Sequence, residues 1–134
     1  MSSVATIKRK DIPPHLEVRG GHMLSGVLKV SGAKNSSLVL MAAALLTKKT
    51  LHLHNVPQLT DIEVMSEILS NLGAKLTKRD NSIEINSESI YNAELSYQLV
   101  HSLRASFFCI GPLLSRLGEA KIPLPGGCNI GARP

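Results

Sequence analysis

The chain has 134 residues, of which 43% are apolar and 19% are charged, and its formal net charge is +5. This length suits one ordinary domain, and the composition is that of a globular protein rather than a disordered one. The positive charge favours anionic partners. Aromatic residues make up only 3% of the chain and no run of five basic residues occurs, which argues against a surface that stacks nucleic-acid bases.

The cysteine spacing and the hydropathy of the chain indicate the cellular compartment of the protein. Cys109 and Cys128 form no CxxC pattern and have no neighbouring histidine, so we expect two free thiols in a reducing cytoplasm. Neither a metal site nor a cofactor is expected. The longest apolar run, 38–46, is about half of the roughly 20 residues that span a bilayer, and no signal-peptide core follows Lys8–Lys10, so no membrane partner is expected.

The first half of the chain alternates between strand and helix patterns. Residues 1–14 mix Ser, Lys and Arg and end in two prolines, which predicts a flexible leader. Residues 15–19 and 27–31 alternate apolar and polar side chains before glycines, which predicts two strands pairing as a hairpin. Residues 35–46 predict a helix buried on most faces. Residues 50–54 predict a strand with two histidines on its outer face, where solvated histidines are commoner than metal ligands.

The second half continues the same layering. Thr60 and Glu63 match a capping box and Gly73 is a stop signal, so a helix over 60–72 is expected, with a buried stripe of Ile62, Met65, Ile68, Leu69 and Leu72. Strands are predicted at 74–78 and 82–86, joined by a turn. Residues 96–117 predict a helix that Gly111–Pro112 kinks or divides, and 120–124 predict a short strand. Helices that connect strands in this order predict an α/β fold.

Three groups of residues have the chemistry of an anion site. Lys34 lies where a strand pattern gives way to a helix, and a lysine there opposes the helix dipole, so an anionic ligand or a merely solvated lysine are the alternatives. Arg104 lies among apolar residues and either lies along them or binds an anion. Cys128 lies in a glycine-rich loop with Arg133 five residues on, so its thiol is either reactive or a passive small residue. Together these residues suggest a small polyanionic substrate.

Eight short motifs follow one another along the chain: Gly32–Asn35, Asn55–Pro57, Asp61–Ile62, Leu72–Ala74, Arg104–Ser106, Gly111–Leu114, Pro125–Cys128 and Gly131–Pro134. These motifs resemble the enolpyruvyl transferase family, in particular its UDP-N-acetylglucosamine 1-carboxyvinyltransferases. The resemblance runs from about Leu16 to the last residue, and its most specific part is a Pro-Gly-Gly-Cys loop whose cysteine the sister enzymes of the shikimate pathway lack. The resemblance implies an incomplete α/β fold of βαβαββ repeat units, an alpha-beta prism. Residues 15–33 would be strands of the second lobe, and residues 34–134 a partial first lobe ending in the catalytic loop.

The resemblance also implies a reaction. It is the transfer of the enolpyruvyl group of phosphoenolpyruvate to the 3-hydroxyl of UDP-N-acetylglucosamine with release of phosphate, the first committed step of peptidoglycan synthesis. The family pattern assigns catalysis to Cys128, as the general acid and the target of fosfomycin. Substrate contacts would be made by Lys34, Asn35, Arg104, Arg133 and Pro134.

Family members are much longer than 134 residues. We therefore expect this chain to be a non-catalytic N-terminal fragment whose partner is the missing C-terminal part of the same enzyme. Two alternatives remain open. The chain is a degenerate module that binds anions or nucleotide sugars without chemistry, or it is an RNA-binding relative of the RNA 3'-phosphate cyclases, which share the repeat architecture.

Overall fold

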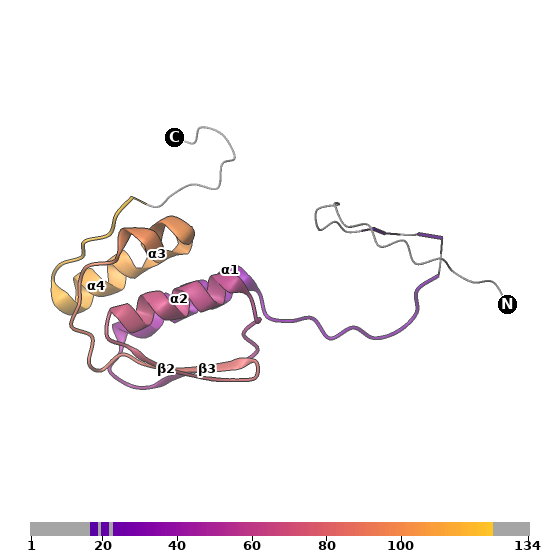
Figure 1. Ribbon diagram of the computed structural model, residues 1–134. Coiled ribbons are helices and arrows are strands. Elements are labelled where there is room, and N and C mark those ends of the chain that lie inside the picture. Colours follow the sequence, from indigo (N-terminus) through magenta and orange to yellow (C-terminus); the bar gives the residue numbers. More distant parts are fainter. Residues whose placement is uncertain (1–16, 19, 22, 125–134) are drawn as a thin grey trace.

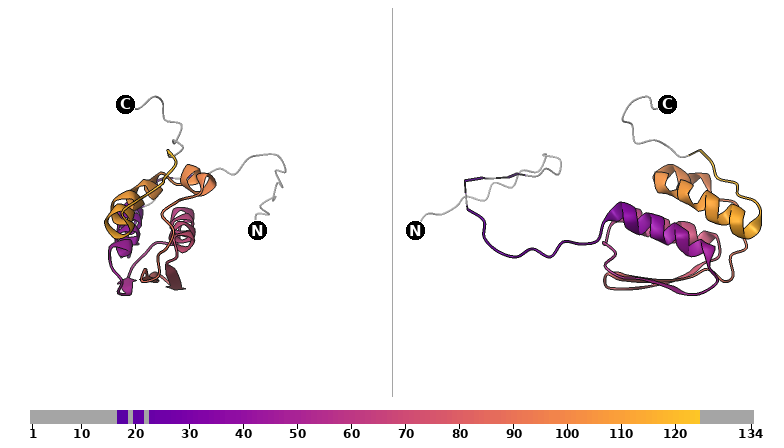
Figure 2. Two further views of the ribbon diagram at one scale, coloured as in Figure 1. Left: turned by 90° about the vertical axis from the view of Figure 1, so that its left-hand side faces the viewer. Right: turned by 180° about the vertical axis from the view of Figure 1, so that it is seen from behind.

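The computed structural model of the chain describes residues 17, 18, 20, 21 and 23–124 (Figure 1). Within them, residues 34–117 form a layer of helices on one face of a small sheet, as the side and rear views of Figure 2 show. Residues 23–33 lead into the first helix without regular secondary structure. The predicted α/β layering is confirmed for this part of the chain.

The first helix, α1, spans Lys34–Ala43 and continues as a short 3-10 turn, η1, at Ala44–Leu46. The stretch is rich in alanine and leucine and has no glycine or proline, which favours a helix. Its inner face is buried, but Val39 and Leu40 are 43% and 49% exposed. The expectation of a helix buried on most faces is therefore wrong, because the described elements cover only one side of α1.

The second helix, α2, spans Thr60–Asn71, and the predicted buried stripe along it is confirmed. The predicted capping box is wrong: Leu59 is the cap residue, no side chain caps the helix, and Glu63 pairs with Lys78 of the sheet instead. Gly73 ends the helix as predicted, with a φ of 103°. A side chain at Gly73 would also lie within 3 Å of the Tyr91 ring, so only glycine fits.

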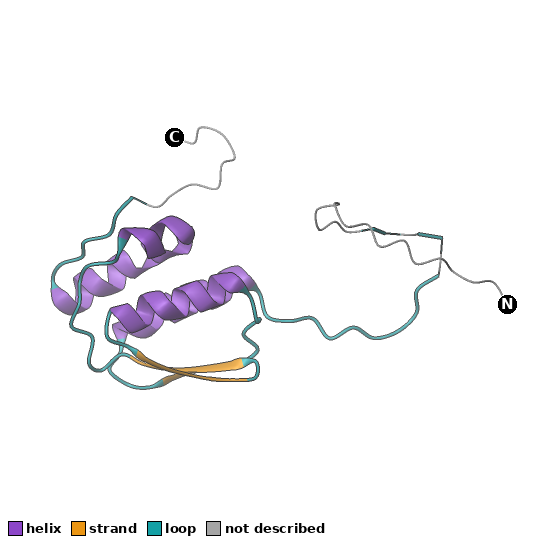
Figure 3. Ribbon diagram, in the orientation of Figure 1, coloured by secondary structure: helices purple, strands orange, loops and turns teal. Residues whose placement is uncertain are grey.

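The sheet has three antiparallel strands, β1 (Leu51–Leu53), β2 (Lys75–Arg79) and β3 (Ser82–Asn86), in the order β1-β3-β2. Figure 3 shows the sheet in orange below the helices. The predictions of strands at 50–54, 74–78 and 82–86 are confirmed. Leu51 and Leu76 both stand opposite Ile85, which is fully buried against the helices. Asp80, in the turn between β2 and β3, has a φ of 49°, a conformation that aspartate tolerates better than most residues.

The region predicted as a helix that Gly111–Pro112 kinks or divides is interrupted at a different place. It forms α3 (Tyr97–Ser102), the 3-10 helix η2 (Arg104–Cys109) and α4 (Ile110–Leu117). The break falls at Leu103, whose backbone is extended and whose side chain is buried. Gly111 and Pro112 instead lie in the first turn of α4, where a proline needs no intrahelical N–H partner. Gly118 ends α4, with a left-handed φ of 77°.

Two strand predictions are not met. Residues 27–31 form no strand, and Val27, Leu28 and Val30 are 104%, 86% and 76% exposed, so the predicted hairpin is wrong for the part of it that the structure describes. A strand requires a neighbour for its backbone hydrogen bonds, and no described segment pairs with this one. That residues 15–33 belong to a second lobe stays a prediction. Residues 120–124 form only a parallel bridge between Lys121 and Glu94.

The core lies between the helices and the sheet. From Lys34 to Asn86 the order is helix, strand, helix, strand, strand, which is the predicted βαβαββ unit without its first strand. The largest fully buried side chains come from all the layers: Met41, Leu45, Ile62, Met65, Ile68, Leu69, Leu72, Ile85, Leu95, Val100, Cys109 and Leu113. Among the described residues, no helix has both the length and the apolar character needed to cross a membrane.

Candidate functional site

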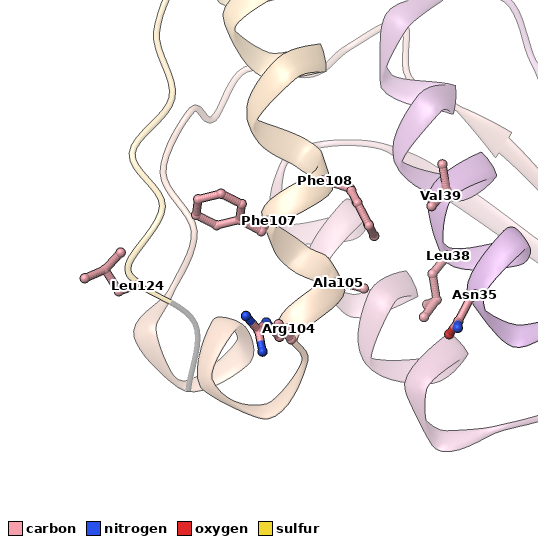
Figure 4. Close-up of a pocket in the computed structure, with 8 residues that line it drawn as sticks. All are labelled: Asn35, Leu38, Val39, Arg104, Ala105, Phe107, Phe108 and Leu124. Atoms are coloured by element: carbon pink, nitrogen blue, oxygen red, sulfur yellow. The ribbon is translucent and has the colours of Figure 1, made fainter. Parts of the chain in front are cut away.

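A pocket of about 540 Å³ lies between α1 and η2 (Figure 4). It brings together two of the predicted substrate contacts, Asn35 from the first turn of α1 and Arg104 from the start of η2, which are far apart in the sequence. The rest of its wall is apolar: Leu38, Val39, Ala105, Phe107, Phe108 and Leu124. Figure 4 shows Asn35 on α1 and Arg104 on the neighbouring helical segment.

Arg104 is the positive charge of the pocket. Its side chain is exposed, and it makes no hydrogen bond or ion pair with any other residue that the structure describes. A guanidinium group has five N–H donors in a planar fork, which suits bidentate binding of phosphate or carboxylate. Arg104 therefore offers an unused anion-binding group at the mouth of an apolar pocket.

Lys34 is the first residue of α1, which begins one residue before its predicted start, and Lys34 does not line the pocket. Its Nζ lies 2.5 Å from Oδ2 of Asp61, and both side chains are partly exposed, at 45% and 36%. From the sequence, only the unfavourable interaction between the charge of Lys34 and the helix dipole was considered. The ion pair changes that argument, because Asp61 compensates the unfavourable interaction without any ligand.

The chain just before Lys34 is held by a close backbone approach. A Cβ atom on Gly32 would lie 1.8 Å from the carbonyl oxygen of Asn55, so only glycine fits there. Asn55 itself has a φ of 57°, in the left-handed region. Both residues belong to the motifs that carry the family resemblance, and together they set the path by which the chain enters α1.

The two cysteines can be treated separately. Cys109 is a free thiol with no exposed surface, and burial raises its pKa to about 12, so it stays protonated and unreactive near neutral pH. Cys128, Arg133 and Pro134 lie outside the described residues, and their predicted roles stay predictions. Leu124, the last residue before the glycine-rich segment, is described and lines the pocket.

The comparison with protein families decides the ancestry. Residues 18–134 match the family of EPSP synthase (3-phosphoshikimate 1-carboxyvinyltransferase), which is most of the chain. The chain belongs to this enolpyruvyl transferase family. The predicted family is thereby confirmed, and its members are enzymes.

Relatives within the enolpyruvyl transferases are similar over the whole chain. The chain is 84% identical over 134 residues to a UDP-N-acetylglucosamine 1-carboxyvinyltransferase of Prochlorococcus marinus (strain NATL2A), and it covers 29% of that relative. It is 57% identical to the enzyme of the same name from strain MIT 9313, covering 31% of it. The chain thus spans under a third of the length of these relatives.

A solved structure gives the same fold. The crystal structure of the enolpyruvyl transferase NikO from Streptomyces tendae matches with a TM-score of 0.66 at 30% identity, over 74% of this chain and 23% of that one. The described elements therefore form part of an enolpyruvyl transferase domain, and the predicted fold class is confirmed.

Local sequence patterns did not predict how two polar residues join distant parts of this enolpyruvyl transferase segment. Arg116 of α4 donates to the carbonyl oxygens of Leu45, Thr47 and Ser87 at 2.8, 3.1 and 3.2 Å. Asp61, which stands out in the sequence only as part of a family motif, pairs with Lys34. Neither role has a local signature, because each partner comes from a distant part of the chain.

His52 of β1 and His54, which follows that strand, are both solvated, in agreement with the interpretation that the sequence favoured. His52 Nδ1 lies 3.6 Å from a Glu84 oxygen, and His54 Nδ1 lies 3.2 Å from Ser82 Oγ, both on the exposed side of the sheet. Among residues 23–124 no cluster of three or more His, Cys, Asp or Glu side chains could hold a metal ion.

Proposed function

We propose that this chain forms the N-terminal part of an enzyme that transfers the enolpyruvyl group of phosphoenolpyruvate to the 3-hydroxyl of UDP-N-acetylglucosamine and releases phosphate. The observation that carries the proposal is the 84% identity, over the whole chain, to a relative named for this reaction. Both proposed substrates are charged phosphate esters that do not cross membranes unaided, so the proposed location is the cytoplasm, where the reaction would begin peptidoglycan synthesis.

The residue roles follow the family pattern. Lys34 and Asn35 would hold phosphoenolpyruvate at the start of α1, where the N-cap residue Ala33 has no polar side chain that could accept from the first free N–H groups. Arg104 would border the UDP-sugar, together with Arg133 and Pro134. The exposed fork of Arg104 supports its part in this proposal, because a phosphate oxygen would meet no competing partner among the described residues.

Cys128 would protonate the methylene carbon of phosphoenolpyruvate during the addition step, before phosphate is eliminated. It would also be the nucleophile that fosfomycin alkylates. The two roles would require a thiol whose pKa lies near the working pH, so that the thiol can donate its proton and the thiolate can attack. Burial raises the pKa of Cys109 to about 12, so Cys109 is no competitor for either role.

The chain alone would not complete this reaction. Its 134 residues match 29% of the relative's length, and the proposed partner is the remaining, C-terminal part of the same enzyme. We expect the isolated chain to release no phosphate from the two substrates in a colorimetric phosphate assay. Sustained turnover by the isolated chain would contradict this expectation.

A chimera tests the function directly. In it, this chain replaces the matching 134 residues of the 84% identical relative from Prochlorococcus marinus NATL2A. The chimera should release phosphate only when both substrates are present, and the Cys128→Ala chimera should lose at least about a hundredfold in rate, in the range of a lost general acid. The matched control is Cys109→Ala, which should stay active.

The same experiment separates the alternative of a binding module. An inactive but folded chimera, combined with binding of UDP-N-acetylglucosamine by the isolated chain in calorimetry, would favour a module that kept its anion sites without the chemistry. An inactive chimera, combined with no binding of UDP-N-acetylglucosamine by the isolated chain, would overturn both the proposed transferase function and the alternative of a binding module.

A further inference from the structure

An ion pair between Lys34 and Asp61 joins the first turns of α1 and α2. Lys34 is the first residue of α1 and Asp61 lies in the first turn of α2, and their side chains meet at 2.5 Å. Asn35, which lines the pocket, is the next residue after Lys34. The pair therefore stands at the edge of the candidate site, although neither of its members lines the pocket.

The ammonium of Lys34 is only partly used by this pair. It has three N–H donors, and Asp61 is its only partner among the residues that the structure describes. The side chain is 45% exposed, so the remaining donors face solvent. A ligand can thus reach Lys34 without displacing Asp61.

Without Asp61, the position of the lysine would be unfavourable. The N-terminus of a helix carries a partial positive charge, which repels an ammonium placed over it. A lysine side chain also has four rotatable bonds and would otherwise spread over many rotamers. The Asp61 carboxylate is itself stabilised by the positive end of α2, so it can hold the ammonium near the start of α1.

We propose that Asp61 is a positioning residue that holds Lys34 in place for an anionic ligand, namely a phosphate or carboxylate group of phosphoenolpyruvate. The inference rests on the proposed function, in which Lys34 contacts that substrate. Asp61 acts through Lys34 and does not touch the ligand itself. Protein kinases use a Lys–Glu pair in the same way to orient a phosphate-binding lysine.

Two possible roles of Asp61 predict opposite changes in anion affinity when its carboxylate is removed. If the carboxylate served only as a counter-ion, it would weaken the local positive potential, and its removal would strengthen anion binding. If it positions Lys34, its removal weakens binding although the site becomes more positive.

The experiment uses the full 134-residue chain and phosphoenolpyruvate as the probe, titrated by NMR. The variants are Asp61→Asn, Asp61→Glu and Lys34→Ala. The matched control is Glu63→Gln, because Glu63 is the other acidic residue in the first turn of α2 but pairs with Lys78. Thermal unfolding of each variant shows whether it is folded at the temperature of the titration.

Asp61→Asn should weaken the binding of phosphoenolpyruvate about three- to tenfold, within the range for a partly exposed ion pair and one tightly coupled ligand contact. Asp61→Glu should restore most of the affinity, Lys34→Ala should lose at least as much as Asp61→Asn, and Glu63→Gln should not change it. An unchanged or tighter affinity in Asp61→Asn overturns the proposal.

A second measurement reports the ion pair without any ligand. Acetic anhydride labels lysines at rates that mass spectrometry resolves, and the paired Lys34 should react more slowly than the exposed Lys48 and Lys49. In Asp61→Asn the Lys34 rate should rise to theirs, and an unchanged rate overturns the proposal.

If the unmodified chain binds no phosphoenolpyruvate, the proposed function of Lys34 fails and this inference fails with it. Normal binding with an unchanged Asp61→Asn affinity contradicts this inference alone.

Discussion

At the scale of single residues, the chemistry of each cysteine depends on its surroundings rather than on the thiol itself. Cys109 follows two phenylalanines at the end of η2 and is fully buried, so its ionised form would lose its hydration. Cys128 follows two glycines in a segment with an arginine. The same functional group is thus inert at one position and the proposed acid at the other.

Alkylation should separate the two thiols. Iodoacetamide or fosfomycin applied to the native chain at pH 7.5 should modify Cys128 and leave Cys109 unmodified, and denaturation in guanidinium chloride should expose both to iodoacetamide. Mass spectrometry of the two tryptic peptides measures this. Equal labelling of both cysteines in the native chain would show that Cys109 is not protected by burial.

The raised pKa of Cys109 also predicts how stability depends on pH. Its pKa is about 12 in the folded chain and about 9 when exposed, so the thiol ionises first in the unfolded state. The contribution of the protonated thiol to the free energy of unfolding is present below pH 9. It is lost as the pH rises toward 12, by up to about 1.4 kcal/mol per pH unit. Denaturant titrations between pH 8 and 11 should show this loss, and it should be smaller in Cys109→Ala than in the unmodified chain.

At the scale of elements, three carbonyl groups at the ends of elements depend on one side chain. Arg116 of α4 binds the carbonyl oxygens of Leu45 in η1, Thr47 just after it, and Ser87 just after β3. These carbonyls end a 3-10 helix and a strand, where regular backbone partners run out. Arg116 therefore joins α4 to the end of the first helix and to the sheet.

Replacing this arginine should destabilise the fold more than replacing an exposed one. Arg116→Ala leaves partly buried carbonyls without a charged donor, and we expect a loss of about 2–3 kcal/mol in the free energy of unfolding. Arg79→Ala, at the exposed end of β2, is the matched control and should change stability by less than about 0.5 kcal/mol. Similar losses in both variants, measured in urea, would contradict the role of Arg116.

At the scale of the whole molecule, the described elements leave an apolar surface uncovered. Val39 of α1 and Phe107 and Phe108 of η2 are 43%, 47% and 53% exposed, and all three line the same pocket. Exposed apolar surfaces of this kind usually mark an interface. In the proposed enzyme, the C-terminal part that follows this chain would cover this apolar surface.

The isolated chain should therefore associate with itself. Sedimentation velocity should show larger species as the concentration rises, and the fluorescent dye ANS should bind to the chain at low concentration. The double variant Phe107→Ser and Phe108→Ser should reduce both effects. A chain that stays monomeric and binds no dye would show that this surface is not an interface.

The sequence by itself determined the family and most of the elements, because these depend on short-range patterns. The stripe of α2, the turn at Asp80, the stop at Gly118 and the family motifs can all be read from neighbouring residues. It also named Asn35 and Arg104 as site residues, and the fold brings both to one pocket.

Only the tertiary structure decided features that join distant segments. The break at Leu103, the exposed side of α1 and the pairing of Lys34 with Asp61 all depend on which surfaces meet. The local pattern at 27–31 is that of a strand, but a strand forms only where another segment accepts its backbone hydrogen bonds. Local patterns determine which conformations are favoured, and long-range partners determine which of them are kept.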